Sequence, residues 1–156
     1  MKSCGVDILG MTKLNFEITT PEGVVYKEEV DQVTLPTQKG EITVLPNHIP
    51  LVAILKPGEL KIVKNKEEEF LACAGGYIEV LPGNRVVVLA DNAERAKDID
   101  ITRAEAARKQ AEDLLKQKHT DDVDYAALAG KIERELTRLR VARRHPAKHG
   151  NPQIEK

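Results

Sequence analysis

The sequence of 156 residues contains no tryptophan and only two cysteines, Cys4 and Cys73. Two cysteines so far apart match neither the close spacing of a zinc site nor a disulfide framework, and the apolar neighbours of Cys73 predict a buried thiol. No apolar run approaches the roughly 20 residues that a transmembrane helix needs. The segment before Met11 has no apolar stretch of the kind found in secretory signals. We therefore expect a cytoplasmic chain that does not enter the membrane.

Recognisable catalytic motifs are also missing. The sequence has no nucleophile elbow, P-loop or dinucleotide-binding fingerprint. Its four histidines lie far apart, and none has a neighbour at the spacing of metal ligands. His48, which lies between Pro46 and Pro50, is more typical of a loop contact than of a general base. The sequence therefore predicts a chain that is not itself an enzyme and that holds no metal.

Up to about Ala90 the sequence consists of short segments in which apolar and polar residues alternate. Leu14, Phe16 and Ile18 follow this pattern, which places apolar side chains on one face of a strand. Proline and glycine separate the segments, and Pro82-Gly83-Asn84 is typical of a hairpin turn. No helical pattern interrupts the series, so we expect an antiparallel β-sandwich rather than a parallel α/β sheet.

The pattern then becomes helical. Thr102 and Glu105 have the spacing of a capping box at the start of a first helix. A second helix is expected from about Asp122 to Arg144. Its expected buried face contains Ala129, Ile132, Leu136 and Leu139. The apolar faces are rich in alanine, and Gly130 within the second helix costs about 1 kcal/mol relative to alanine, so we expect a helical hairpin that is held loosely.

These patterns divide the chain into parts of different character. We expect an N-terminal extension over residues 1–11, a β-sandwich domain over 12–95, a helical hairpin over 96–144 and a disordered tail over 145–156. A turn at 119–122 should connect the two helices. The fold class is therefore β plus α, with an N-terminal antiparallel β-sandwich followed by a C-terminal two-helix hairpin.

Basic residues are concentrated near the C-terminus. Residues 131–148 include seven basic side chains and two acidic ones, in a chain whose formal net charge is −1, and this excess predicts an acidic partner. Arg134 and Arg138 are four residues apart and share a helix face, where like charges repel. Arg134 has no carboxylate three or four residues away, and Arg138 has only Glu135. Uncompensated arginines on one face suit a phosphate group, while a solvated basic face is the open alternative.

Three segments carry a resemblance to a known family. They are GEITVLPNHIPLVA at residues 40–53, AGGYIEV at 74–80 and ERAKDIDITRA at 94–104. In this order, and followed by a two-helix region, they are typical of the epsilon subunit of bacterial F-type ATP synthases, which the sequence resembles over residues 11–144. The resemblance implies a β-sandwich joined to a helical hairpin, in a non-catalytic central-stalk subunit that serves ATP synthesis and hydrogen ion transport.

The resemblance also implies a location and a set of partners. The subunit would be peripheral, at the cytoplasmic face of the bacterial cell membrane, in contact with the gamma subunit and the ring of c subunits. Glu41 and His48 match the end that faces gamma and the c-ring. In an extended state the hairpin would reach the alpha and beta subunits of the catalytic hexamer and inhibit ATP hydrolysis. The basic residues expected at that inhibitory contact are Arg138, Arg140, Arg143 and Arg144.

Bacillus-like members of this family bind ATP in their compact state through an Ile/Leu-Asp-x-x-Arg-Ala motif. The motif is intact here at residues 99–104. By resemblance, the ATP-binding residues are Glu94, Ile99, Asp100, Arg103, Ala104, Arg134 and Arg138. Ile99 and Asp100 would hold the adenosine part and the three arginines the phosphates. ATP is thus expected as a regulatory ligand, and the sequence leaves open whether magnesium takes part.

Two residues bear on this assignment. Asp100 lies next to a predicted helix start, where an aspartate commonly caps the helix, and a cap can also contact a ligand. Gln110 stands where some relatives have a further arginine. The loss of one charge-assisted contact, typically about 1.5–3 kcal/mol, would weaken ATP binding tenfold or more.

Two other interpretations fit parts of the pattern. In one, the chain is a β-sandwich binding module whose basic second helix docks on an acidic partner or on nucleic acid, with a steep salt dependence. Against this, the helix has Tyr125 as its one aromatic residue and no recognised docking motif. In the other, the hairpin is a fixed brace rather than a switch, and a chain trimmed at Ala93 would distinguish the two.

Overall fold

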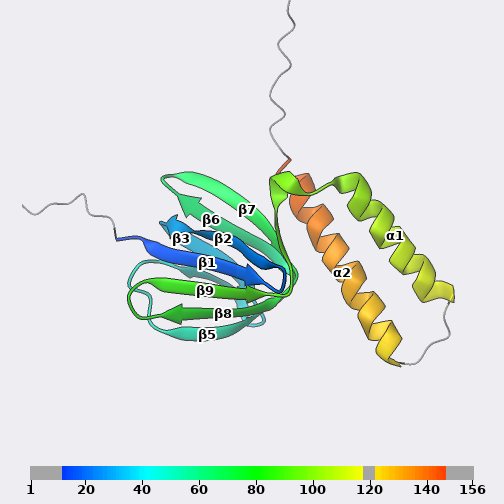
Figure 1. Ribbon diagram of the computed structural model, residues 1–156, viewed down its shortest axis with the longest axis horizontal. Coiled ribbons are helices and arrows are strands. Elements are labelled where there is room, and N and C mark those ends of the chain that lie inside the picture. The colour runs from blue at the N-terminus through cyan, green and yellow to red at the C-terminus, as the bar shows by residue number, and fades with distance from the viewer. Residues whose placement is uncertain (1–11, 118–121, 147–156) are drawn as a thin grey trace, which may run out of the picture.

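The computed structural model describes residues 12–117 and 122–146 (Figure 1). The predicted extension at 1–11, the turn residues 119–121 and the tail from 147 onward lie outside the described residues. The strands of the described chain are β1 (Leu14–Thr20), β2 (Gly23–Val30), β3 (Gln32–Thr37), β4 (Gly40–Val44), β5 (Leu51–Leu55), β6 (Gly58–Lys64), β7 (Glu67–Cys73), β8 (Gly76–Leu81), β9 (Arg85–Ala90) and β10 (Ala93–Arg95). A single 3-10 turn, η1 (Ala96–Asp98), leads to α1 (Ile101–Gln117) and α2 (Asp122–Arg144).

The strands form one continuous sheet that folds over on itself as a sandwich (Figure 1). The order is β10-β7-β6-β3-β5-β8-β9-β1-β2, and β4 pairs with β3 beside this path. The prediction of a sandwich followed by a helical hairpin is confirmed. One ladder differs from the antiparallel expectation, because β1 pairs with β9 in parallel, with Phe16 opposite Val86. Side chains alternate in the same way in both kinds of ladder, so the sequence pattern does not distinguish them.

The core of the sandwich consists of the side chains that alternate inward along each strand. Phe16, Leu35, Ile62 and Ile78 are each 1% exposed or less. Cys73 belongs to the same core, as its apolar neighbours predicted, and burial raises the pKa of its thiol above the usual value. The sandwich therefore has a hydrophobic core of its own, built without any residue of α1 or α2.

The second helix, and not the first, lies against the sandwich (Figure 1). Val141 and Ala142 of α2 pack with Ala96 and Ile99, and with Ala72 of β7. The predicted buried face of this helix is wrong at one position: Leu136 is 38% exposed, and Glu135 beside it is 1% exposed. The reason is that α2 contacts both α1 and the sheet, so its buried surface is wider than the single apolar stripe used for the prediction.

Gly76 at the start of β8 is required by a close backbone contact. Its φ is +130°, and a Cβ there would lie 2.1 Å from the carbonyl oxygen of Leu89 and 2.8 Å from Cα of Ala90. Because both atoms are backbone, no rotamer change relieves the overlap. We expect Gly76→Ala to destabilise the sandwich by about 3 kcal/mol or more, and so to lower the melting temperature by roughly 10 °C, measured by circular dichroism.

Gly83→Ala is the matched control. Gly83 also has a positive φ, +78°, but an added Cβ would meet no atom within 4 Å. The free energy of unfolding of this variant should fall only by the cost of placing a non-glycine residue in the left-handed region, about 1–2 kcal/mol. Equal melting temperatures for the two variants would contradict the role assigned to the contact at Gly76.

Candidate functional site: an arginine–carboxylate cluster between hairpin and sandwich

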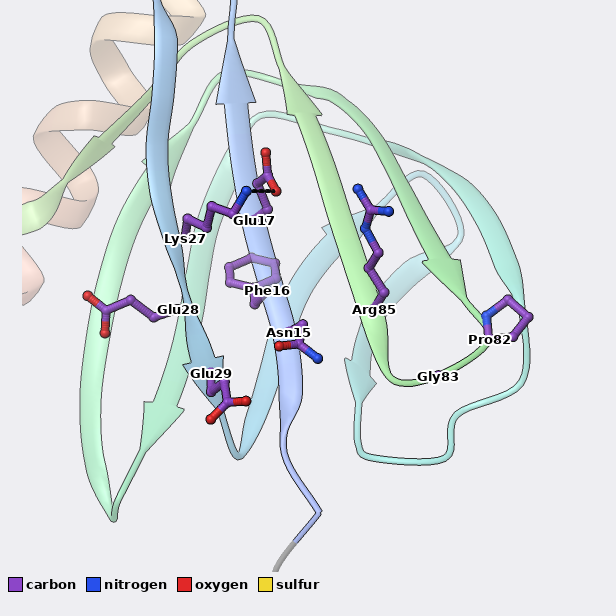
Figure 2. A pocket seen from close by; sticks show the side chains of 9 residues that line it. All are labelled: Asn15, Phe16, Glu17, Lys27, Glu28, Glu29, Pro82, Gly83 and Arg85. Atoms are coloured by element: carbon purple, nitrogen blue, oxygen red, sulfur yellow. Dashed lines mark ion pairs between the residues drawn. The ribbon is translucent and has the colours of Figure 1, made fainter.

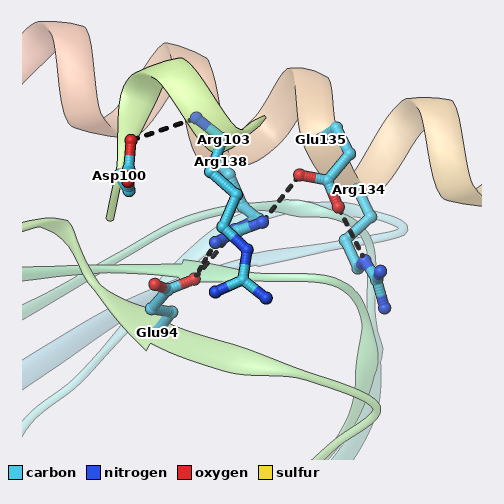
Figure 3. A network of polar contacts seen from close by, with 6 residues as sticks. All are labelled: Glu94, Asp100, Arg103, Arg134, Glu135 and Arg138. Carbon is cyan, nitrogen blue, oxygen red and sulfur yellow. Dashed lines mark hydrogen bonds and ion pairs between the residues drawn. The ribbon is translucent and has the colours of Figure 1, made fainter. Parts of the chain in front are cut away.

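Arg138 of α2 lies at the centre of a group of ion pairs that joins the hairpin to the sandwich (Figure 3). Its Nε and Nη2 atoms each lie 2.8 Å from Oε2 of Glu94 in β10, and Nη1 lies 2.7 Å from Oε2 of Glu135. Every guanidinium nitrogen of Arg138 thus has a carboxylate partner. The guanidinium can make such multiple contacts because it is planar and donates in several fixed directions.

Glu135 is the most deeply buried charged side chain in this group. Its side chain is 2% exposed, and its second oxygen, Oε1, accepts a hydrogen bond of 3.3 Å from Nε of Arg134. A buried carboxylate is tolerated only when cations or hydrogen-bond donors compensate for the lost water. Arg134 and Arg138 supply that compensation, so the two arginines predicted to share one helix face hold a carboxylate between them.

The carboxylates of the cluster stabilise the charged form of Arg138. Burial alone would lower the pKa of Arg138, but its contacts with Glu135 and Glu94 outweigh burial and raise the pKa above the usual value. The side chain of Arg103 is exposed, and in the view of Figure 3 it extends from α1 toward Arg138 and Glu94. The three arginines and three carboxylates shown there (Glu94, Asp100 and Glu135) carry no net charge when all are ionised.

The first turn of α1 positions Arg103. Oδ1 of Asp100 accepts a hydrogen bond of 3.0 Å from the backbone N–H of Arg103, so the predicted capping role of Asp100 is confirmed. The helix begins at Ile101, and the capping box expected at Thr102 is therefore wrong. Asp100 was the better candidate by its residue type, because aspartate is preferred over threonine at this position.

The remaining predicted ATP-binding residues are buried. Ile99 is 8% exposed and packs against Ala96, Val141 and Ala142, and Ala104 has no exposed surface. The structure thus brings Glu94 and Arg138 into direct contact, and it places Arg134 beside them through Glu135. Ile99 and Ala104 form part of the packed support of the site rather than its open surface.

A hollow of about 380 Å³ adjoins the cluster on the side of Arg134. Its lining residues come from α2 and from the connections that flank β8 and β9: Ala74, Asp91, Ala127, Gly130, Lys131 and Arg134. Gly130 and the two alanines leave room, while Lys131 and Arg134 supply positive charge. Space and cationic side chains, the two features that a phosphate-bearing ligand needs, therefore occur next to the ion-pair cluster.

The C-terminal end of α2 is fastened to the sandwich by a second set of contacts. The ring of His145 stacks on Phe70 of β7, with centroids 3.5 Å apart and planes inclined by 6°. Nη1 of Arg144 and Nε2 of His145 lie 3.4 Å and 3.2 Å from the same Glu59 oxygen. The sequence-based division assigned His145 to the tail, but its ring lies on the sandwich.

The basic residues predicted for the inhibitory contact are largely engaged within the chain. Arg138 pairs with Glu94 and Glu135, Arg143 pairs with Glu105 of α1, and Arg144 pairs with Glu59 of β6. Arg140 is exposed. In the docked hairpin, these cations are therefore directed at carboxylates of the same chain.

Glu41 and His48 lie apart from this cluster. Glu41 is exposed in β4, and the Nδ1 atom of His48 lies 2.6 Å from the carbonyl oxygen of Ile49 in the following loop. The loop is tied to the β8–β9 turn, because the backbone N–H of Asn47 donates to Oδ1 of Asn84 at 2.5 Å. Ile49 at its tip is 74% exposed. The end of the sandwich that carries His48 thus presents apolar surface.

A row of exposed apolar side chains crosses the outer face of three neighbouring strands. Ile54 of β5 lies opposite Tyr77 of β8, which in turn lies opposite Leu89 of β9. Their exposed fractions are 44%, 56% and 57%, and Val52 on the same face of β5 is 69% exposed. Contiguous exposed apolar surface of this kind marks a contact site for another protein. The sequence indicated this surface only indirectly, because these strands have apolar residues at consecutive positions and so on both of their faces.

A different hollow, of about 560 Å³, lies over β1, β2 and the β8–β9 turn (Figure 2). Glu17 and Lys27, neighbours on β1 and β2, line one edge of it and form an ion pair of 3.1 Å. Glu28, Glu29 and Arg85 also line it. Carboxylates outnumber cations here, which does not suit a phosphate-bearing ligand.

Within residues 12–117 and 122–146, no three His, Cys, Asp or Glu side chains are grouped so that they could hold a metal ion. Across the same residues, neither helix has the length and apolar character required to cross a bilayer.

Two solved structures that resemble this chain come from ATP synthases. A chain of the Euglena gracilis mitochondrial ATP synthase superposes with a TM-score of 0.66 at 22% identity, over 93% of this chain and 89% of that one. A chain of the Tetrahymena thermophila mitochondrial ATP synthase central stalk and c-ring superposes with a TM-score of 0.56 at 16% identity, over 84% and 98%. At these identities the likeness concerns the fold.

Sequence relatives are closer. The ATP synthase epsilon chain of Herpetosiphon aurantiacus is 48% identical over 83% of this chain and 94% of its own length. That of Halalkalibacterium halodurans is 39% identical over 86% of this chain and 100% of its own. The family model for the ATP synthase delta/epsilon β-sandwich domain matches residues 13–96, and the model for the long α-helix domain matches residues 97–143. The chain therefore belongs to the delta/epsilon chain family of ATP synthases.

Proposed function

We propose that this chain is a regulatory central-stalk subunit of a bacterial F-type ATP synthase, and that ATP stabilises its docked hairpin. As an epsilon chain it is a non-catalytic subunit of the complex. In the proposed mechanism the hairpin restrains ATP hydrolysis when it leaves the sandwich and enters the catalytic hexamer. The observation that carries the proposal is the arginine cluster at the boundary between hairpin and sandwich.

The position of the cluster supports ATP as the regulatory ligand. Arg103 belongs to α1 and Arg134 and Arg138 to α2, while Glu94 belongs to the sandwich. A phosphate bound by arginines from both helices next to β10 would contact groups that are together only when the hairpin is docked. A ligand shifts a conformational equilibrium by its difference in affinity for the two states. ATP bound here would therefore favour the docked state.

The ion pairs of α2 support a switch whose two states exclude one another. Arg138, Arg143 and Arg144 neutralise carboxylates of the same chain while the hairpin is docked. The same arginines are the proposed contacts with acidic segments of the alpha and beta subunits, and they cannot serve both sets of partners at once. Their internal pairing also weakens the alternative in which a permanently free basic helix docks on nucleic acid.

Two surfaces of the sandwich remain for the partners in the stalk. The apolar row of Ile54, Tyr77 and Leu89 is proposed as the contact with the gamma subunit. The end that carries Glu41, His48 and exposed Ile49 is proposed to face the c-ring, at the cytoplasmic side of the membrane. Exposed apolar surface supports both assignments, because it gains free energy when a partner covers it.

Calorimetric titration of the isolated chain with ATP tests the proposal, with ADP and GTP as controls. We expect selective ATP binding near one site per chain, and we expect Arg103→Ala to weaken it tenfold or more, which corresponds to one charge-assisted contact of about 1.5–3 kcal/mol. Lys109→Ala, an exposed cation on the same helix, is the matched control and should leave the affinity unchanged. Absence of ATP binding up to millimolar concentration would contradict the assignment of ATP as the regulatory ligand, while the family membership would be unaffected.

A further inference from the structure

Glu135 is not among the residues assigned to the ATP site. Its carboxylate nevertheless contacts Arg134 and Arg138, the two arginines of α2 that are proposed to bind phosphate. Its two oxygens are divided between the two helix arginines, with Oε2 2.7 Å from Nη1 of Arg138 and Oε1 3.3 Å from Nε of Arg134. The residue itself is 1% exposed. A buried carboxylate that bridges two guanidinium groups presents the same kind of charge and geometry as two oxygens of a phosphate.

The contacts of Arg138 strengthen this comparison. Glu94 engages Nε and Nη2, so Glu135 holds the remaining nitrogen, Nη1. A phosphate that takes a bidentate place on Arg138 therefore competes with one of the two carboxylates. Glu94 also anchors α2 to the sandwich, whereas Glu135 belongs to the same helix as both arginines. Releasing Glu135 would leave the link between hairpin and sheet intact.

Charge leads to the same conclusion. With Glu135 in place, the three arginines are already balanced by the carboxylates of Glu94, Asp100 and Glu135, and a triphosphate would add several uncompensated negative charges. Like charges in a partly buried site repel strongly, because little water screens them. Without the charge of Glu135, these groups would carry a net positive charge of one.

We propose that Glu135 is an internal competitor that occupies the arginines in the absence of nucleotide and thereby sets the ATP concentration at which the site fills. This inference rests on the proposed ATP site. It assigns two consequences to one side chain: the hairpin can dock without ATP, and ATP binds more weakly than the three arginines alone would allow. The sensitivity of the switch would then depend on residue 135.

The test compares ATP affinity in Glu135→Gln, Glu135→Ala and the full natural chain. Glutamine keeps the shape and removes the charge, and alanine removes the buried polar group while favouring the helix. Glu133→Gln is the matched control, because Glu133 is exposed on the same helix and loses the same charge. We expect both variants at position 135 to bind ATP about tenfold or more tightly than the natural chain. Glu133→Gln should bind ATP with unchanged affinity.

Docking must be measured in the same samples, because an undocked hairpin lowers the apparent affinity by the fraction that is binding-competent. Hydrogen exchange of the α2 amides without ATP gives that fraction, and each dissociation constant is corrected by it. We also expect ATP to increase the protection of α2 more in Glu135→Gln than in the natural chain. The alanine variant decides the question if the glutamine variant loses its helix content.

The outcomes separate the two proposals. Tighter corrected binding in the variants at position 135 supports the competitor, even if the natural chain binds ATP too weakly to detect. Measurable and equal ATP affinities in all four chains would overturn the proposal that Glu135 competes with ATP, and would leave the proposed ATP site intact. No binding by any of the chains, including those without the Glu135 charge, would overturn both.

Discussion

Replacing Arg138 with alanine should release the hairpin from the sandwich. The substitution leaves Glu94 without its cation and leaves Glu135, whose side chain is 2% exposed, with Arg134 as its remaining partner. Breaking a buried ion pair costs about 3–5 kcal/mol. Because Arg134 stays in place, we expect about 2–3 kcal/mol here, which shifts the docking equilibrium roughly a hundredfold.

Hydrogen exchange of the amides in α1 and α2, and trypsin cleavage near Lys97, would report this release. Arg140→Ala is the charge-matched control, since Arg140 is exposed on the same helix. A second substitution sharpens the test: Glu135→Ala added to Arg138→Ala removes the stranded carboxylate and should restore part of the docking. If Arg138→Ala and Arg140→Ala leave the hairpin equally protected, the ion-pair cluster does not hold it.

Removal of the whole hairpin should abolish the restraint on ATP hydrolysis without preventing assembly. The sandwich core contains no residue of α1 or α2, so a chain that ends at Asp98 should fold. The structure places the cut after Asp98 rather than at Ala93, because β10 pairs with β7 and Ala96 is buried. We expect the complex reconstituted with this shortened chain to hydrolyse ATP several-fold faster than the complex with the full chain.

The same experiment separates a switch from a fixed brace. If the hairpin were a brace, the shortened chain would fail to assemble or would uncouple hydrolysis from proton transport. Adding the full chain to a complex that lacks the subunit is the control for the preparation. Assembly together with unchanged hydrolysis would contradict the inhibitory role, while the place in the stalk would be unaffected.

Several features of the cluster were visible in the sequence. The capping role of Asp100 followed from its residue type beside a predicted helix start, and the structure confirms it. The four-residue spacing of Arg134 and Arg138 placed both on one face of α2. The family resemblance placed Glu94 and Arg138 in one site, but their direct contact, which spans 44 residues, was not predicted. Local periodicity says nothing about distant partners.

Other features could not be obtained in that way. The stacking of His145 on Phe70 and the pairing of Arg144 with Glu59 join parts of the chain more than 70 residues apart. Such contacts depend on where the docked helix meets the sheet. Glu135 was recognised as a neighbour of Arg138, but its burial was not predicted, because an isolated glutamate on a polar helix is usually solvated.

By itself, the sequence determined the strands, the two helices and the residues that share each face, because the alternation and helical periods reflect local backbone geometry. It also determined the clustering of basic charge on α2. Only the tertiary structure decided that α2 rather than α1 lies against the sheet and that β1 pairs with β9 in parallel. It also decided that Glu135 is buried and forms ion pairs with Arg134 and Arg138. These choices depend on packing and desolvation between distant segments, and a local pattern carries no information about them.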